Sequence, residues 1–167
     1  ILLVMAGWEA LAAARPASLP RGRRWATNWG VAVLDMLVIR LLFPAAAVGA
    51  ALDASAQGWG LFNLAAAPGW IAGIVCLVVL DLAIWGQHVV FHRVPLLWRL
   101  HKVHHADRDV DVTTALRFHP LEATLSMLLK VALVYALGAP AWAVLAFEAL
   151  LNGCAMFNHA NVALPPA

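Results

Sequence analysis

The segment HVVFHRVPLLWRLHKVHH, residues 88–105, holds five of the seven histidines of this 167-residue chain. These five form two groups, His88 with His92, and His101 with His104 and His105. The spacings are i, i+4 and i, i+3, i+4, so on a helix each group projects from one face. The remaining two, His119 and His159, lie downstream, and no histidine precedes residue 88. The pattern predicts two imidazole clusters directed at a common point.

The composition is that of a membrane protein. Hydrophobic residues make up 63% of the chain, and the mean hydropathy is +0.81, well above the usual values for globular proteins. Charged residues make up 12%, and the formal net charge is +2, which is too small and too scattered for a nucleic-acid surface. Cys76 and Cys154 lie in separate apolar runs, which argues against a disulfide framework and predicts two small buried residues.

The apolar runs predict an all-α, polytopic integral membrane protein. The predicted membrane segments are residues 1–14 (the tail of a first span), 29–52, 69–91, 121–138 and 140–157. The runs from 29 onward are long enough, or nearly so, to cross about 30 Å of hydrocarbon as a helix. Pro44 is expected to kink its span, and Gly138-Ala139-Pro140 to turn the last two into a hairpin. We interpret residues 1–167 as a single domain whose histidine-box core covers 81–165.

Basic residues predict which ends of the spans face the cytoplasm. Segments 15–28 and 93–120 are rich in arginine, as cytoplasmic loops are. Segment 53–68 carries one acid and no base, as expected of an outer loop. The span at 69–91 then delivers His88 and His92 to the cytoplasmic end, and the hairpin returns His159 to that side. The sequence therefore predicts a cytoplasmic histidine-rich metal layer.

Neutral imidazole is a common ligand of zinc, copper and iron, and several kinds of metal site can be set aside. Val89 follows His88, so the HExxH motif of zinc proteases is missing. Glu122 and Glu148 have no histidine at i+3, so a carboxylate-bridged di-iron bundle is not indicated. The HxxHH spacing does not suit bis-histidine haem binding. Asp107, Asp109 and Asp111 are spaced as in a calcium loop, but Val112 and Phe118 replace its glycine and glutamate, so a solvated charged turn is expected.

Three polar residues are candidates for supporting the ligands. Asp81 lies two helical turns before His88 and is predicted to pair with Arg40 or with a histidine N–H group. A structural ion pair unrelated to metal is the alternative. Asn158 and Asn161 flank His159 and are expected either to bond ligand histidines or line the substrate mouth, or to end the helix.

The motifs resemble those of the fatty acid hydroxylase and sterol desaturase superfamily. They are HxxxH at 88–92, HxxHH at 101–105, TALRFHPLE at 114–122 and FNHANVALP at 157–165. The resemblance covers about residues 20–165, with the four motifs in the family's order. It implies a membrane-embedded non-haem di-iron enzyme that uses dioxygen and an external electron donor of ferredoxin or cytochrome type to oxidise an unactivated C–H bond of a lipid.

By motif position, the resemblance implies iron ligands at His88, His92, His101, His104 and His105. His119 and His159 occupy further family histidine positions, as ligands or as supports. The family also carries a final HxxHH box beyond the NHxN segment, so the sequence is expected to be part of a longer protein whose remaining ligands complete the two-iron site. Desaturation or ether cleavage at the same site is one alternative function. A non-catalytic metal-binding or metal-transport protein is another, although a transporter should place ionisable ligands near the middle of the membrane.

Overall fold

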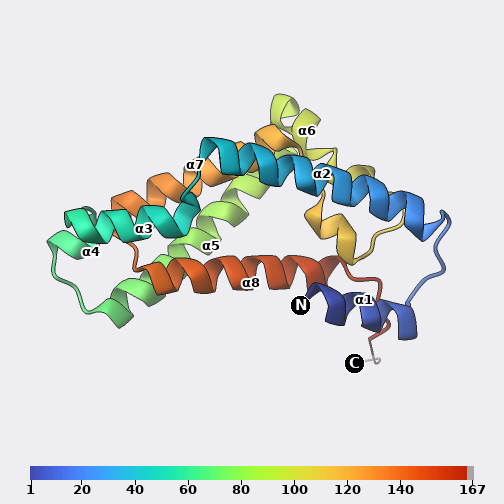
Figure 1. Ribbon diagram of the computed structural model, residues 1–167, viewed down its shortest axis with the longest axis horizontal. Coiled ribbons are helices and arrows are strands. Elements are labelled where there is room, and N and C mark those ends of the chain that lie inside the picture. The colour runs from blue at the N-terminus through green and yellow to red at the C-terminus, as the bar shows by residue number, and fades with distance from the viewer. Residues whose placement is uncertain (165–167) are drawn as a thin grey trace.

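The computed structural model describes residues 1–164 as a bundle of helices (Figure 1). The α-helices are α1 (Leu2–Leu11), α2 (Arg21–Leu42), α3 (Ala46–Gln57), α4 (Leu61–Leu64), α5 (Gly69–Arg93), α6 (Pro95–His101), α7 (Pro120–Leu137) and α8 (Ala141–His159). Two 3₁₀ helices, η1 (His104–Ala106) and η2 (Val112–Leu116), lie between α6 and α7. Within residues 1–164 there is no strand, only an isolated bridge between Ala13 and Val162. The predicted all-α fold is confirmed.

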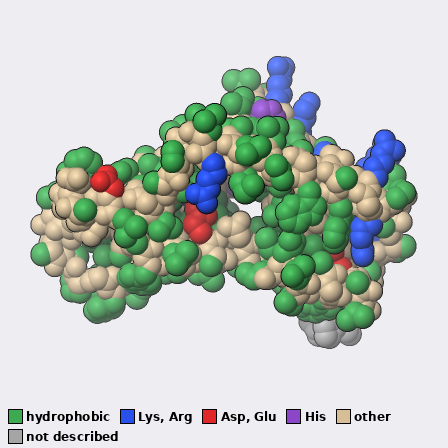
Figure 2. Space-filling view, viewed as in Figure 1, with side chains coloured by type: hydrophobic (Ala, Val, Ile, Leu, Met, Phe, Trp, Pro, Cys, Tyr) green, Lys and Arg blue, Asp and Glu red, His purple; other side chains and the backbone are tan. Residues whose placement is uncertain are grey.

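Four helical segments are long and apolar enough to cross a membrane: Arg21–Leu64, Gly69–Arg93, Pro120–Leu137 and Ala141–His159. Hydrophobic side chains cover much of the surface in Figure 2. Large apolar residues such as Leu41, at 80% exposed, and Leu145, at 62%, face outward on these segments. Such a surface suits lipid as the surrounding medium, so the chain is a multi-pass membrane protein.

The core is built largely from small residues, which let the helices approach closely. Ala47, Ala50 and Ala51 of α3 are buried against Val134 of α7 and Phe147 of α8. Small residues are typical of helix contacts within membranes, where close packing drives association in place of the hydrophobic effect. In Figure 1, α7 and α8 run antiparallel along the length of the molecule and α5 crosses between them. The predicted hairpin at 138–140 is confirmed.

The first predicted full span has a different form from the one expected. Segment 29–52 was predicted as one kinked helix, but α2 ends at Leu42 and α3 begins at Ala46. Proline disfavours helical geometry in the residue before it and cannot donate a backbone hydrogen bond, so Pro44 breaks the helix. The basic segment 15–28 is also not wholly a loop, because α2 begins at Arg21.

The predicted outer loop is partly helical, and one cysteine lies in an unexpected environment. α3 continues to Gln57, and the short α4 occupies Leu61–Leu64 within segment 53–68. Cys76 is buried as expected, but Cys154 is exposed, and both thiols are free. Pro165, the last residue of the FNHANVALP motif, lies outside the described residues.

The turn between α7 and α8 depends on the absence of a side chain at Gly138. This residue ends α7 with φ +66°, and an added Cβ would lie 2.7 Å from both the Trp59 carbonyl oxygen and Asn63 Nδ2. Gly60, with φ +94°, lies against the Gly138 backbone, and a Cβ added to it would clash with the backbone nitrogen of Gly138. The α3–α4 connection therefore packs directly on the hairpin turn.

Replacing Gly138 with alanine should destabilise the hairpin. A left-handed conformation costs a non-glycine residue about 1–2 kcal/mol, and the clash with the Trp59 backbone adds to this cost. We expect Gly138→Ala to lower the midpoint of thermal unfolding in detergent, measured by near-UV circular dichroism. Gly30→Ala is the control, because a Cβ at this α2 position meets nothing within 4 Å. Equal midpoints for the two variants would contradict this account of the turn.

Candidate metal centre

Six of the seven histidines meet at one end of the bundle, which confirms that the two clusters converge. They come from the end of α5 (His88 and His92), the end of α6 (His101), η1 (His104 and His105) and the end of α8 (His159). Ring centroids of His88 and His101 lie 4.7 Å apart, and those of His104 and His159 also lie 4.7 Å apart. The hairpin thus brings His159 back to the other histidines.

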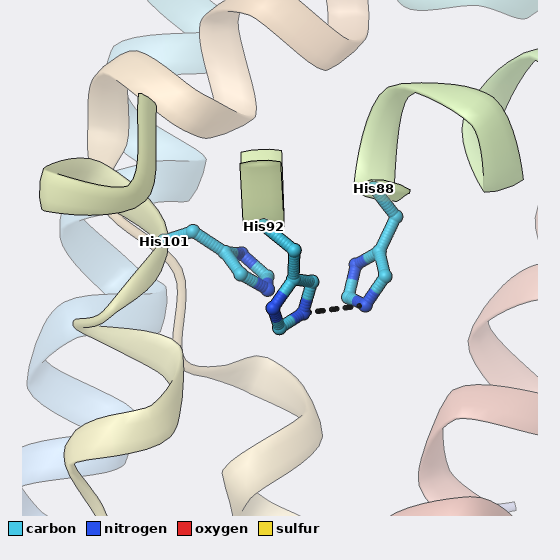
Figure 3. A group of neighbouring side chains, drawn as sticks. All are labelled: His88, His92 and His101. Atoms are coloured by element: carbon cyan, nitrogen blue, oxygen red, sulfur yellow. Dashed lines mark hydrogen bonds between the residues drawn. The ribbon is translucent and has the colours of Figure 1, made fainter. Parts of the chain in front are cut away.

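His88, His92 and His101 form the tightest group (Figure 3). One ligand nitrogen from each lies within 4.8 Å of the others, and the Nε2 atoms of His88 and His92 are 3.1 Å apart. His101 is fully buried, whereas His88 and His92 are exposed. The group has the donor atoms and the open side that a catalytic metal site requires.

The hydrogen bonds of His104 and His159 determine which of their nitrogens are free. His104 Nδ1 lies 3.1 Å from the Arg117 carbonyl oxygen, and His159 Nδ1 lies 2.7 Å from the Ala155 carbonyl oxygen. A carbonyl only accepts hydrogen bonds, so each Nδ1 carries the proton and each neutral ring keeps its Nε2 lone pair. Those two Nε2 atoms are 2.9 Å apart. Two lone pairs facing each other at this distance repel unless a cation lies beside both.

The spacing of the paired nitrogens fits metal coordination. The Nε2–Nε2 distances are 2.9 Å for His104 and His159, 3.1 Å for His88 and His92, and 3.2 Å for His101 and His105. Two imidazoles bound at right angles to one ion, each about 2.1 Å from it, have nitrogens about 3 Å apart. The residues present therefore fit a metal-binding role.

The protonation state of the two histidines of η1 also favours metal binding. Burial, together with the nearby His159 and His105, lowers the pKa of His104 to about 3. The pKa of His105 is lowered as well, by burial and by His101 and His92. A neutral imidazole is the form that binds metal, and His104 is neutral at any pH well above 3.

Glu122 is a contact of the site that the sequence pattern did not identify. Its Oε1 lies 2.6 Å from His101 Nδ1, and the glutamate is only 5% exposed. The carboxylate accepts the Nδ1 proton and leaves His101 Nε2 directed toward the cluster, as carboxylates do for histidine ligands in metal sites. Because Pro120 starts α7, Glu122 lies in the first helical turn, next to the histidine cluster.

Glu9 is a second buried carboxylate whose role the sequence did not reveal, and it binds the backbone of the segments next to the histidines. This α1 residue is 1% exposed, and its Oε1 accepts the backbone N–H groups of Val112 and Asn161, each at 2.7 Å. One acceptor therefore joins the chain just after His159 to the start of η2. Asn161 adds two hydrogen bonds to the Arg15 backbone, so α1 is fastened to the segment that carries His159.

Two of the three aspartates expected to form a solvated turn, Asp107 and Asp111, are instead part of a buried network, whereas Asp109 makes exposed hydrogen bonds to Ser18 and Leu19. Arg24 bonds Asp107 through Nε at 2.8 Å and Asp111 through Nη1 at 2.9 Å. Hydrogen bonds from Arg24, Asn28 and Thr114 outweigh the effect of burial, so the pKa of Asp107 lies below its usual value. The expectation was wrong because α2 crosses this loop and supplies a guanidinium 83 residues away.

Four predicted site residues make no hydrogen bond or ring contact with the other histidines within residues 1–164. His119 caps α7 by accepting the Leu121 N–H at 3.1 Å, and within residues 1–164 no ring contact or hydrogen bond joins it to another histidine. Asp81 is exposed, and its expected pairing with Arg40 or a histidine is absent from the described part of the chain. Asn158 is exposed, and neither it nor Asn161 bonds a histidine in the described structure.

Glu122→Gln should weaken metal binding without unfolding the protein. The amide preserves the shape of the side chain but removes the negative charge that holds the His101 proton, and loss of such a partner typically costs about 10–100-fold in metal affinity. We expect this loss in a cobalt(II) titration followed by absorbance, with unchanged far-UV circular dichroism. Asp53→Asn is the control, because the exposed Asp53 carboxylate bonds only Tyr135 within residues 1–164. Equal affinities of the two variants would contradict an orienting role for Glu122.

The chain matches the model of a known protein family. The family model described as "Fatty acid hydroxylase" matches residues 73–167, more than half of the chain. The matched region begins in α5 and includes all seven histidines. No solved structure matches the chain.

Proposed function

Since the chain belongs to the fatty acid hydroxylase family, we propose that it is a membrane-bound, non-haem di-iron oxygenase that hydroxylates an unactivated C–H bond of a lipid. Membership indicates a membrane enzyme of the lipid hydroxylase or desaturase type. The observation that carries the finer proposal is the convergence of six imidazoles with Nε2 atoms paired at 2.9–3.2 Å. Acid–base side chains alone do not cleave such a bond, so a redox metal is required.

The proposed reaction inserts one oxygen atom of dioxygen into the C–H bond and releases the other as water. Its balance requires two electrons and two protons, which we assign to an external donor of ferredoxin or cytochrome type. Bound iron would supply the oxidising power. The chain's own contribution is to hold His101 by Glu122 and His104 by the Arg117 carbonyl, each with Nε2 unprotonated.

A leucine-lined groove beside the histidines supports a lipid substrate. It lies between α6 and α7, has a volume of about 370 Å³, and is lined by Leu96, Leu97, Leu100, Leu121, Thr124 and Leu125. The Thr124 hydroxyl donates to the Pro120 carbonyl at 2.8 Å, so the groove offers no free polar side-chain group. Leu100 precedes His101 in the chain, and Leu121 precedes Glu122. An apolar chain in the groove would therefore end near the proposed metal layer.

We also propose that the metal layer faces the cytoplasm. Exposed basic residues Arg15, Arg21, Arg93, Arg99 and Lys102 lie in the segments around the histidines. An excess of lysine and arginine marks the cytoplasmic side of membrane proteins. On that side a soluble electron donor can reach the histidines.

The decisive experiment combines iron analysis with lipid mass spectrometry. The purified full-length protein should contain iron, and cells that express it under ¹⁸O₂ should accumulate a lipid heavier by one labelled oxygen. His104→Ala with His159→Ala should abolish both signals, whereas Cys154→Ser, at an exposed free thiol, should retain them. A product that has lost two hydrogens would show desaturation instead, and protein without iron or product would contradict the proposal.

Filling the groove should block substrate without removing metal. Leu125→Trp adds bulk to the wall of the groove, and we expect activity on long-chain lipids to fall by about tenfold or more, a barrier change of about 1.4 kcal/mol or more, while iron content stays constant. Leu128→Trp is the control, because Leu128 lies one turn further along the exposed side of α7 and outside the groove. Equal activity of the two variants would exclude the groove as the substrate site.

A further inference from the structure

A second cavity, polar and rich in arginine, lies close to the histidines. It has a volume of about 360 Å³ and opens between the start of α2 and the loop that follows η1. Its polar walls include Arg23, Arg24, Asp107, Arg108 and Arg117. The volume falls within the range of small-molecule sites, about 300–1,000 Å³. The metal centre does not use this cavity.

Asp107 contributes little negative charge to the cavity, because its oxygens already have partners. Oδ1 accepts from Arg24 Nε at 2.8 Å, and Oδ2 accepts from Arg24 Nη2 at 2.8 Å. Asn28 and Thr114 also donate to Oδ2, at 2.9 and 3.0 Å. Arg24 also pairs with Asp111, so these three groups together carry one net negative charge. They form a fixed wall of the cavity, and the three remaining arginines outnumber this charge.

The other three arginines lack a carboxylate partner within residues 1–164. Arg117 donates Nε to the Val103 carbonyl at 2.8 Å and Nη1 to Asn28 Oδ1 at 3.1 Å, and both acceptors are neutral. Arg23 and Arg108 are exposed, and neither makes a side-chain hydrogen bond or ion pair in the described part of the chain. Three uncompensated guanidinium groups therefore border one concave site.

The start of α2 adds positive potential to the same site. Leu19 and Pro20 line the cavity, and α2 begins at Arg21. This helix end has no side-chain cap and no acid in its first turn. The free N–H groups and the dipole of a helix N-terminus favour an anion. The Asp109 carboxylate already accepts the backbone N–H groups of Ser18 and Leu19 just before this end, so the guanidinium groups supply most of the attraction for an anion.

We propose that this cavity binds the phosphate group of an anionic phospholipid. Guanidinium groups bind phosphate in a planar, two-pronged geometry. We assign the phosphate to a lipid because of where the cavity lies: the membrane-spanning segment Arg21–Leu64 begins at its rim. Further along α2, Trp29 and Val33 are exposed and can contact acyl chains. The cavity therefore lies at the boundary between a polar and an apolar environment, as a lipid headgroup does.

The binding test does not depend on catalysis. The detergent-solubilised full-length protein is titrated with phosphatidylglycerol, with phosphatidylcholine and with inorganic phosphate, and bound ligand is counted by native mass spectrometry. Phosphatidylglycerol should bind, with phosphatidylcholine weaker. Arg23→Gln with Arg108→Gln should lower the affinity for phosphatidylglycerol about tenfold or more, because two charge-assisted contacts are lost.

The matched control removes two charges from the same end of the molecule but outside the cavity. Arg99→Gln with Lys102→Gln changes exposed residues that do not line it, and should change the affinity by less than about twofold. Equal losses in the two double variants would overturn the proposal in favour of a diffuse surface charge. Equal binding of the two lipids would also overturn it, and binding of inorganic phosphate alone would exclude a lipid as the source.

Discussion

The approach of His104 Nε2 to His159 Nε2, at 2.9 Å, constrains the rest of this structure. The two residues are 55 positions apart, so their contact requires that α7 leave the histidine end and that α8 return to it. The two helices have nearly the same length, 18 and 19 residues. The end of α8 therefore lies within one helical turn of the level at which α7 begins. A tight turn at Gly138 serves the same end, because it fixes where α8 begins relative to the end of α7.

Most buried charged groups have partners; Asp35, which forms no ion pair within residues 1–164, is the exception. Glu122 is matched by His101, Arg24 by two aspartates, and Lys130 by Glu148 at 2.6 Å. Burying an unpaired charge costs far more than a paired one, so these contacts hold one arrangement of the loops around the histidines. Glu9 also holds two loops in place, because it accepts hydrogen bonds from two backbone N–H groups. Loops fixed in this way keep the nitrogens of the histidines close to one another.

The sequence was sufficient to predict the last three spans, the hairpin and the convergence of the histidine boxes, whereas residues 1–14, predicted as the tail of a span, contain only the short helix Leu2–Leu11. Each of these depends on local signals, namely apolar length, a glycine-proline turn and helical spacing. Glu9 and Glu122 could not be found in this way, because each is defined by a residue far away in the chain, Val112 for Glu9 and His101 for Glu122. The break at Pro44 was mistaken for a kink because hydropathy is continuous across it. The aspartate loop was expected to be solvated because Arg24, its partner, lies in a segment that appeared to be a loop.

The fastening of α1 to the chain beyond α8 has a consequence for biosynthesis. Glu9 accepts a hydrogen bond from Asn161, 152 residues later, and Ala13 pairs with Val162. α1 is synthesised long before the segment that follows α8, so it must wait for that segment before it reaches its final position. Until α8 has been inserted, His159 is not beside His104. A nascent chain therefore cannot hold an ion between the rings of His104 and His159.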